Sequence, residues 1–311
     1  MRYTNIAMQI LAAKECGLIK SNAQFWKYHQ DSKAFRELLS SRQDIKNMTT
    51  RLSEIYSFSE DNEGFICAYD KHFPAINPNA KNSDKPYLLF YKGDIGLLEN
   101  LNSNVAVIGH TDPTEEVENR ERVVVEQLVH NKLIIVSGLA KGCDAIAHRV
   151  CLESGGKTIA ILPTTLQKIS PAINRGLAGD IVMNGGLLLT EYYKEPQGRQ
   201  ETIKRYIERD RLQALFAKSI ILVASYRKNE GDSGSRHAME SAKEFTIARY
   251  VMYNCETDVE DKQFGLNRQL LDFGINIKVL SKSSIEEIKL INNPLLDKNS
   301  EVHSTTQITL F

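Results

Sequence analysis

Short apolar runs alternate with longer amphipathic segments through the centre of the chain. The apolar runs are rich in β-branched residues, as expected of buried strands. They lie at residues 105–108, 133–136, 158–162, 186–189, 220–224 and 249–252. Segments with apolar residues at helical spacing lie between them, at residues 115–131, 144–154, 172–178, 204–217 and 235–245. This alternation predicts an α/β fold with an extended, Rossmann-like, doubly wound and mostly parallel sheet.

The pattern changes on both sides of this central region. Residues 1–62 carry apolar residues at helical spacing and few glycines, which predicts a small helical N-terminal module. Residues 63–100 hold two strand-like runs around a loop rich in Pro and Asn, and we expect them to lead into the main domain. The main domain is expected to span residues 101–291. Residues 292–311 are polar and without pattern, so we expect a disordered tail.

Composition and charge narrow the function classes. Hydrophobic residues make up 42% of the 311 residues and charged residues 25%, as in ordinary globular proteins. Basic and acidic residues balance at 39 each, so a nucleic-acid site would have to be a local patch. The five cysteines lack metal-binding or redox spacing, so we expect reduced thiols and no metal. Early charges and the lack of a long apolar run predict a soluble cytoplasmic protein without a membrane partner.

Polar turns follow the predicted strands. In a parallel sheet the carboxyl ends of the strands meet at one edge, where ligands bind. The first two turns contain Gly109, His110, Ser137, Gly138, Lys141 and Gly142. The second turn opens a helix, whose unpaired N–H groups and dipole favour an anion. With Lys141 beside them, these groups predict a phosphate-binding site, although a plain strand-to-helix turn would also explain the glycines.

Two further segments carry candidate phosphate contacts. Arg209 and Arg211 lie two positions apart in YIERDRLQALF, so they cannot share one helical face. If a helix begins just after Arg209, this arginine could reach a groove from the preceding turn, with Arg211 structural; two surface ion pairs are the alternative. Ser233, Gly234 and Ser235 precede another predicted helix and form a second candidate anion site.

The order of these motifs closely resembles the DNA-processing protein A family (DprA, also called Smf). The resemblance extends from about residue 64 to residue 291. Besides the first two turns, it rests on Asn174 in SPAINRGL, Glu191 after LLLT, YIERDRLQALF, GDSGSRHAMESA and GLNRQLLDFG. It implies a domain without catalytic activity or cofactor that binds single-stranded DNA, usually as a homodimer. Family members help to load RecA-type recombinase in natural transformation and recombination, and the candidate residues named above would contact the DNA.

The chain departs from the family pattern at several of these positions. The first turn commonly reads Gly-Ser-Arg in the family and reads Gly-His-Thr here. Asp210 stands in place of an asparagine, and Lys141 in place of an arginine. Without a partner base, His110 is expected to be a ligand contact, and His148 a packed helical side chain. The changes bear on DNA affinity more than on fold.

A nucleotide-binding sensor or a phosphoribohydrolase-like protein of the same Rossmann-like superfamily is the alternative function. Phosphoribohydrolases typically carry a Pro-Gly-Gly-x-Gly-Thr turn, which this chain lacks. Hydrolysis is therefore disfavoured. Nucleotide sensing stays open, because a phosphate site does not distinguish a nucleotide from a DNA backbone.

The chain ends in QITLF, which resembles the short peptide by which bacterial proteins bind the replicative sliding clamp. Leu310 and Phe311 would enter an apolar pocket and Gln307 would hydrogen-bond at its rim. A tail that packs on its own domain is the alternative. The sliding clamp is therefore a further candidate partner.

Overall fold

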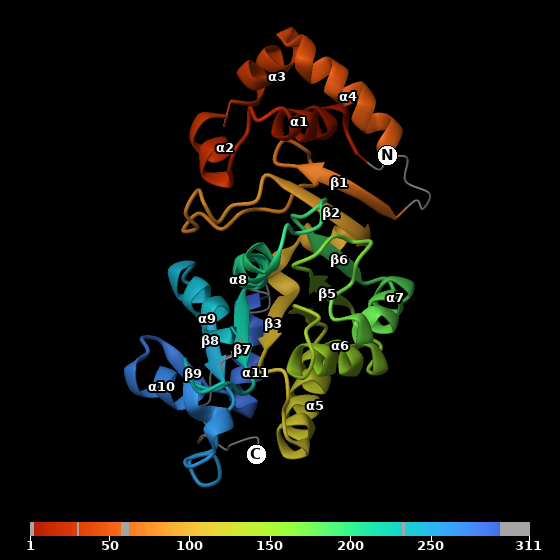
Figure 1. Cartoon of the computed structure of the whole chain (residues 1–311). Helices are drawn as coiled ribbons and strands as arrows, with labels where there is room; N and C mark the ends of the chain where they lie inside the picture. The colour runs from red at the N-terminus through yellow and green to blue at the C-terminus, as the bar shows by residue number, and fades with distance from the viewer. Residues whose placement is uncertain (1–2, 30, 57–61, 232–233, 293–311) are drawn as a thin grey trace.

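Nine strands form one sheet in the order β1-β2-β6-β5-β4-β3-β7-β8-β9 (Figure 1). The structure is a computed structural model that describes residues 3–29, 31–56, 62–231 and 234–292. Pairing is parallel from β6 to β9, and antiparallel between β1, β2 and β6. The predicted α/β fold with a mostly parallel sheet is therefore confirmed. The strands are β1 Glu63–Cys67, β2 Leu88–Gly93, β3 Asn104–Ile108, β4 Ile134–Ser137, β5 Thr158–Ile161, β6 Leu187–Thr190, β7 Ser219–Leu222, β8 Ala248–Val251 and β9 Ile277–Val279.

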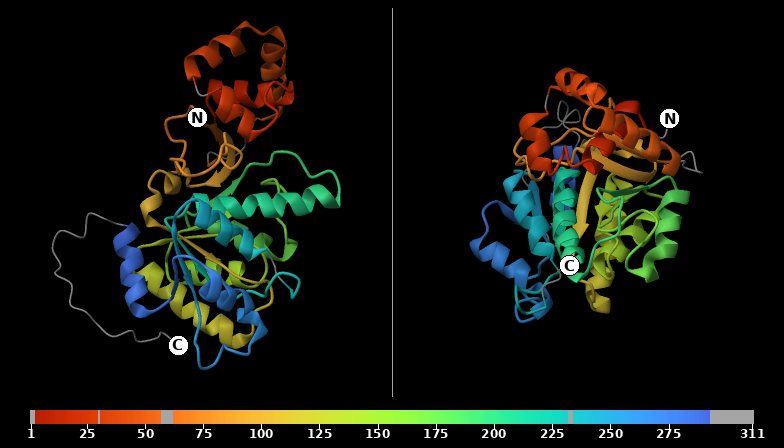
Figure 2. Two further views of the ribbon diagram at one scale, coloured as in Figure 1. Left: turned by 90° about the vertical axis from the view of Figure 1, so that its left-hand side faces the viewer. Right: turned by 45° about the horizontal axis from the view of Figure 1, so that its top comes forward.

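Helices cover both faces of the parallel part (Figures 1 and 2). The alternation along β3 shows why: Val105 and Val107 pack with α5, α6 and α11, while Ala106 and Ile108 pack with α8 and α9. Both faces of the central strands are thus buried. The helices of the main domain are α5 Glu115–His130, α6 Cys143–Glu153, α7 Arg175–Met183, α8 Arg199–Leu215, α9 Ser235–Glu244, α10 Gly265–Phe273 and α11 Lys282–Asn292.

Four helices form the N-terminal module. They are α1 Asn5–Glu15, α2 Asn22–Tyr28, α3 Ser32–Ser41 and α4 Gln43–Ile55. Thr4, Ser21 and Asp31 begin the first three by accepting backbone N–H groups with their side-chain oxygens. The module lies over the antiparallel edge, where Leu88 and Phe90 of β2 contribute to its core (Figure 1). The segment 63–100 thus supplies two strands of the same sheet.

The order in which strands are added to the sheet reverses beside β3. From β3 it adds β4, β5 and β6 on one side and then returns to place β7 on the other. The carboxyl ends of β3 and β7 are joined by a hydrogen bond of 2.9 Å from His110 N to the Ala224 carbonyl oxygen. A crevice outside these two strand ends is where open α/β sheets bind ligands.

The described residues were also compared with the predictions about membranes, metals and the sliding clamp. None of the helices that the structure describes is long and apolar enough to cross a bilayer. The described residues also contain no cluster of three or more His, Cys, Asp or Glu that could hold a metal ion. The predicted clamp-binding residues Gln307, Leu310 and Phe311 lie outside the described residues.

Candidate functional site

The loop between β4 and α6 is held from both sides at the switch point of the sheet. The Asn174 amide donates to the carbonyl oxygens of Leu139 and Ala140, at 3.0 Å each. Gly142 has a φ of +69°, and a Cβ there would lie 2.5 Å from the His110 carbonyl oxygen. Only glycine fits this close approach. The loop therefore packs against the turn that follows β3.

Lys141 is the exposed cation of this loop. Gly142 is the N-cap residue of α6 and offers no side chain to cap the helix. Within the described part of the chain, the backbone N–H groups of Lys141 and Gly142 donate no hydrogen bond. Unpaired N–H groups at the positive end of a helix dipole, beside an ammonium group, form an anion site. This group of donors is called the Lys141 site below.

Three other residues that were predicted to contact phosphate are buried, and their side chains form hydrogen bonds within the protein. The buried Ser137 hydroxyl donates to the Val107 carbonyl oxygen at 2.7 Å, and the buried Ser235 hydroxyl donates to that of Gly109 at 3.0 Å. Asn174 is 1% exposed. These residues shape the edge of the sheet around the Lys141 site and do not face solvent.

His110 is buried beside an aromatic ring. Its imidazole meets the Tyr226 ring edge-on, with centroids 5.1 Å apart, and Nδ1 accepts from Asp112 N at 3.3 Å. Burial lowers the pKa of His110, while the neighbouring Gln263 side chain and the charges of Asp112 and Asp261 oppose the shift. The neutral ring packs under the turn, so its role here is structural.

Arg209 does not precede a helix, because α8 begins at Arg199 and includes both predicted arginines. It is 4% exposed. Its guanidinium lies 3.6 Å from the Asp144 carboxylate and 3.1 Å from that of Asp210, and donates to the Ile161 carbonyl oxygen at 3.3 Å. A Cβ on Gly138 would lie 1.1 Å from Arg209 Nη1. The arginine thus fills the space under the loop.

Two carboxylates lie at the helix starts that the sequence marks as anion sites. Asp144 accepts from Ala140 N at 3.3 Å, and burial raises the pKa of Asp144 while Arg209 opposes the shift. At the start of α9, a Cβ on Gly234 would lie 3.2 Å from Asp210 Oδ2. The predicted second site thus has a carboxylate of the chain beside it. Its remaining member, Ser233, lies outside the described residues.

Arg211 connects α8 with the N-terminal module. Its guanidinium forms a bidentate pair with Glu191, at 2.8 and 2.7 Å, and donates to the Asp84 carbonyl oxygen at 3.0 Å. The Asn22 amide donates to the same Glu191 carboxylate at 3.1 Å. Because the guanidinium is engaged on several sides, Arg211 holds three segments together.

Sequence reasoning missed three residues near the Lys141 site. Ile173, which is 74% exposed, and the exposed Arg175 flank Asn174 and so lie beside the loop that Asn174 holds. Tyr226 follows β7 and packs on His110 at the carboxyl edge. Tyr226 closely follows the end of β7, which was the available signal for it, whereas Ile173 and Arg175 lie well beyond the end of β5 and carried no such signal. Apolar and aromatic side chains beside cations are typical of surfaces that bind single-stranded nucleic acid.

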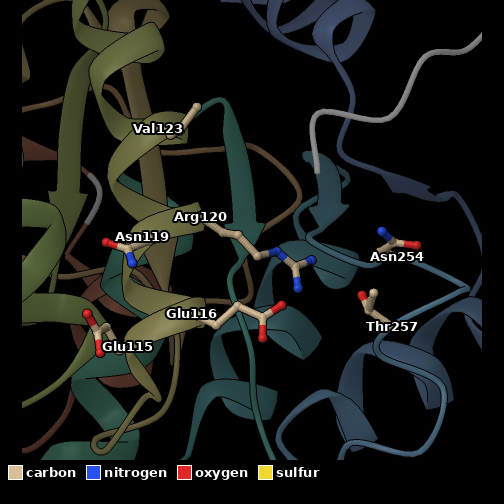
Figure 3. A pocket seen from close by; sticks show the side chains of 7 residues that line it. All are labelled: Glu115, Glu116, Asn119, Arg120, Val123, Asn254 and Thr257. Atoms are coloured by element: carbon tan, nitrogen blue, oxygen red, sulfur yellow. The ribbon is translucent and has the colours of Figure 1, made fainter.

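A separate hollow of about 620 Å³ lies between α5 and the segment after β8. Figure 3 shows Glu115, Glu116 and Arg120 along one side of it, facing Asn254 and Thr257. Arg120 is held in a bidentate pair with Asp258 at 2.8 and 2.9 Å. The glutamates at its rim disfavour phosphate, so this hollow is not part of the Lys141 site.

Residues 64–288 match the family described as DNA recombination-mediator protein A. The DNA processing protein DprA of Streptococcus pneumoniae is 35% identical over 161 residues, which cover 52% of this chain and 55% of that protein. Protein Smf of Synechocystis sp. is 31% identical over 244 residues, which cover 78% of this chain and 58% of that protein. The matches thus span less than two thirds of the length of these relatives.

Two solved structures resemble the fold. The X-ray structure of S. pneumoniae DprA has a TM-score of 0.63 and 26% identity, covering 91% of this chain and 92% of that one. The Helicobacter pylori DNA processing protein A, described by its unique single-stranded DNA binding mode, has a TM-score of 0.59 and 25% identity, covering 75% and 96%. The family match runs from β1 to α11. It includes all the motifs on which the family resemblance was based. The chain belongs to the DNA recombination-mediator protein A family, DprA/Smf.

Proposed function

We propose that this chain is a non-catalytic recombination mediator that binds single-stranded DNA at the carboxyl edge of its sheet. The observation that carries the proposal is the Lys141 site, an exposed lysine at a helix start where the backbone N–H groups of Lys141 and Gly142 donate no hydrogen bond within the described residues. It occupies the switch point of a scaffold that belongs to the DprA/Smf family. The single-stranded DNA binding mode of the H. pylori relative supports the same ligand.

The surroundings of the Lys141 site suit a single strand. A phosphate would accept from the N–H groups of Lys141 and Gly142 and pair with the ammonium group. Arg175 would supply a second charge, while Ile173 and Tyr226 offer apolar and aromatic surface to the bases. Because Arg209 and Arg211 are paired with carboxylates, they support this edge and do not contact DNA.

The proposed dimer and recombinase are those that the family resemblance suggests, and the proposed clamp contact is suggested by the QITLF sequence. In this proposal the protein acts as a homodimer, needs no cofactor and helps to load a RecA-type recombinase onto the bound strand. Residues 307–311 tether it to the sliding clamp. A pull-down that retains equal amounts of clamp with and without these five residues would contradict the tether.

The test is fluorescence anisotropy with labelled single-stranded oligonucleotides at low and moderate salt, with duplex DNA as the control. Lys141→Ala should weaken binding to all sequences and reduce the slope of log affinity against log salt by about 0.7, the value for one phosphate contact on a single strand. Lys46→Ala, which removes an exposed lysine of α4, is the matched control. If the parent binds no DNA, a thermal-shift screen with mono- and cyclic nucleotides tests the nucleotide-sensor alternative.

A further inference from the structure

A groove of about 310 Å³ runs between α9 and α10, outside the Lys141 site. Figure 1 shows these two helices beside β8 and β9. Among the described residues that line the groove, four are cations and one, Glu240, is acidic. We call this feature the α9/α10 groove. Its polar and aromatic lining consists of Lys228, Arg236, Glu240, Lys243, Arg249, Gln269 and Phe273.

Arg249 is a buried cation at the inner wall of this groove. It begins the buried part of β8 and is 6% exposed. Its Nη2 donates to the Ile275 carbonyl oxygen, and no carboxylate of the described residues lies within 4.0 Å of it. Burial lowers the pKa of Arg249, which is consistent with the missing countercharge. A buried guanidinium without a carboxylate is costly, and an anionic ligand would relieve that cost.

Two acids near the groove are paired with lysines outside its lining: Glu244 with Lys81 at 2.8 Å, and Glu287 with Lys278. Glu240 is the acidic side chain that remains in the lining, against four cations. In contrast, Lys228 and Lys243 are exposed and form no ion pair within the described residues. The local charge is therefore positive although the whole chain is neutral, which favours a polyanion here.

The groove is also continuous with a second hollow and carries an exposed aromatic ring. Lys243 and Arg249 line both the groove and a hollow of about 750 Å³ at the amino ends of β7 and β8. Phe273, at the end of α10, is 82% exposed. Cations spaced along a groove with an accessible ring are the combination that binds phosphates and stacks bases of a single strand.

We propose that the α9/α10 groove holds a second segment of the same single-stranded DNA that the Lys141 site binds. The strand's phosphates lie along Lys228, Lys243 and Arg249, and a base stacks on Phe273. This inference rests on the proposed function. Lys228 and the start of α9 lie at the carboxyl edge, so the strand can pass from one site to the other. The ten residues of α9 are about 15 Å long, which is enough for a short run of nucleotides.

Oligonucleotide length separates the two sites. A short oligonucleotide of about 5 nucleotides fills the Lys141 site alone, and one of about 20 nucleotides reaches both. Lys243→Glu and Phe273→Ala should each weaken binding of the long strand by about tenfold and leave the short strand unchanged. Lys141→Ala should weaken both. Lys46→Glu on α4 and Tyr28→Ala on α2 are the matched controls, since both side chains are exposed on the N-terminal module.

Three outcomes would overturn this inference. Equal affinity of the groove variants and the parent for the long strand would show that the groove holds no DNA, while the Lys141 site stands. A loss of dimer on Phe273→Ala, measured by analytical ultracentrifugation, with DNA affinity unchanged would make this face a contact between two copies. If the parent binds neither oligonucleotide, the proposed function fails and the groove proposal fails with it.

Discussion

Gly138 and Arg209 illustrate how single residues fix the edge of the sheet. The guanidinium of Arg209 occupies the place where a side chain on Gly138 would begin, and it also holds Asp144 beneath the loop. The two residues lie far apart in the sequence, yet neither can change alone. A residue that looks like a DNA contact from its charge is here a buried support.

Gly138→Ala should therefore destabilise the protein. The new Cβ would lie 1.1 Å from Arg209 Nη1 and 2.7 Å from Asp144 Oδ2, so the buried pair must separate. We expect a loss of about 3 kcal/mol in the free energy of unfolding, measured by chemical denaturation. Gly179→Ala is the control, because nothing lies within 4 Å of a Cβ at that position of α7. It should be neutral or stabilise by up to about 1 kcal/mol.

The burial of Glu121 predicts that the stability of the protein depends on pH. This residue lies fully buried on α5, and burial raises its pKa well above 4.5, although the neighbouring Cys143 thiol opposes the shift. The folded state therefore holds a proton that the unfolded state releases above pH 4.5. The stability that this group contributes is full below pH 4.5 and is lost as the pH rises through the raised pKa.

Glu121→Gln should remove this dependence. The variant should be more stable than the parent at pH 8, and its free energy of unfolding should fall less steeply with pH, by at most about 1.4 kcal/mol per unit. Denaturation at a series of pH values measures the difference. Glu116→Gln, which alters an exposed glutamate on the same helix, controls for the loss of a charge. Parallel curves for Glu121→Gln and the parent would contradict the assignment.

The candidate residues could be identified from the sequence, but whether each side chain is exposed or buried could not be predicted from it. A strand end and a glycine turn pointed to Ser137, the family resemblance pointed to Asn174, and the basic segment YIERDRLQALF pointed to Arg209. Each proved to be buried because a partner from another element uses its polar group: Val107 for the serine, the loop carbonyls for the asparagine and Asp144 for the arginine. Such pairings depend on the packing of segments that are remote in sequence. Lys141 is exposed because no such partner reaches it.

At the scale of elements, α8 joins the main domain to the N-terminal module. Arg211 on this helix meets Glu191 after β6, and Asn22 of α2 donates to the same carboxylate. One largely shielded ion pair, whose side chains are 11% and 12% exposed, therefore links three segments. Removing either partner would leave an uncompensated charge.

A double-mutant cycle on Arg211→Ala and Glu191→Ala tests this link. Each single variant should cost about 3–5 kcal/mol, and the double variant less than the sum, with a coupling of roughly 1–3 kcal/mol. Hydrogen exchange should also become faster in α2, since Asn22 loses its acceptor in the Glu191 variant. Additive effects without a change in exchange would mean that the pair does not hold the module.

Most elements of the main domain could be predicted from the sequence, because buried parallel strands are continuous apolar runs. The start of α8 could not, since its first residues lack a buried apolar side chain and Ile203 is 51% exposed. Without an apolar stripe, the periodicity became visible only later in the helix. The strands with which β1 and β2 pair could not be predicted either, because β2 pairs with β6, which is distant in the sequence.

At the scale of the whole molecule, the N-terminal module covers an apolar face of the sheet. Phe65, Leu88 and Phe90 are buried against its helices. A variant that begins at residue 63 would expose these side chains on an antiparallel edge. It should lose soluble protein and aggregate, as measured by size-exclusion chromatography. A soluble variant that elutes without aggregates would show that the module is dispensable for folding.

The position of β7 beside β3 has a consequence for how the chain is made. Val105 pairs with Ser219, so the centre of the sheet stays open while the ribosome adds the three strands and four helices that lie between them in sequence. The open edge of a nascent sheet is prone to pair with other chains. Folding should therefore be slow, and products that terminate before β7 should need chaperones or be degraded. The core can close only when the last third of the chain has left the ribosome.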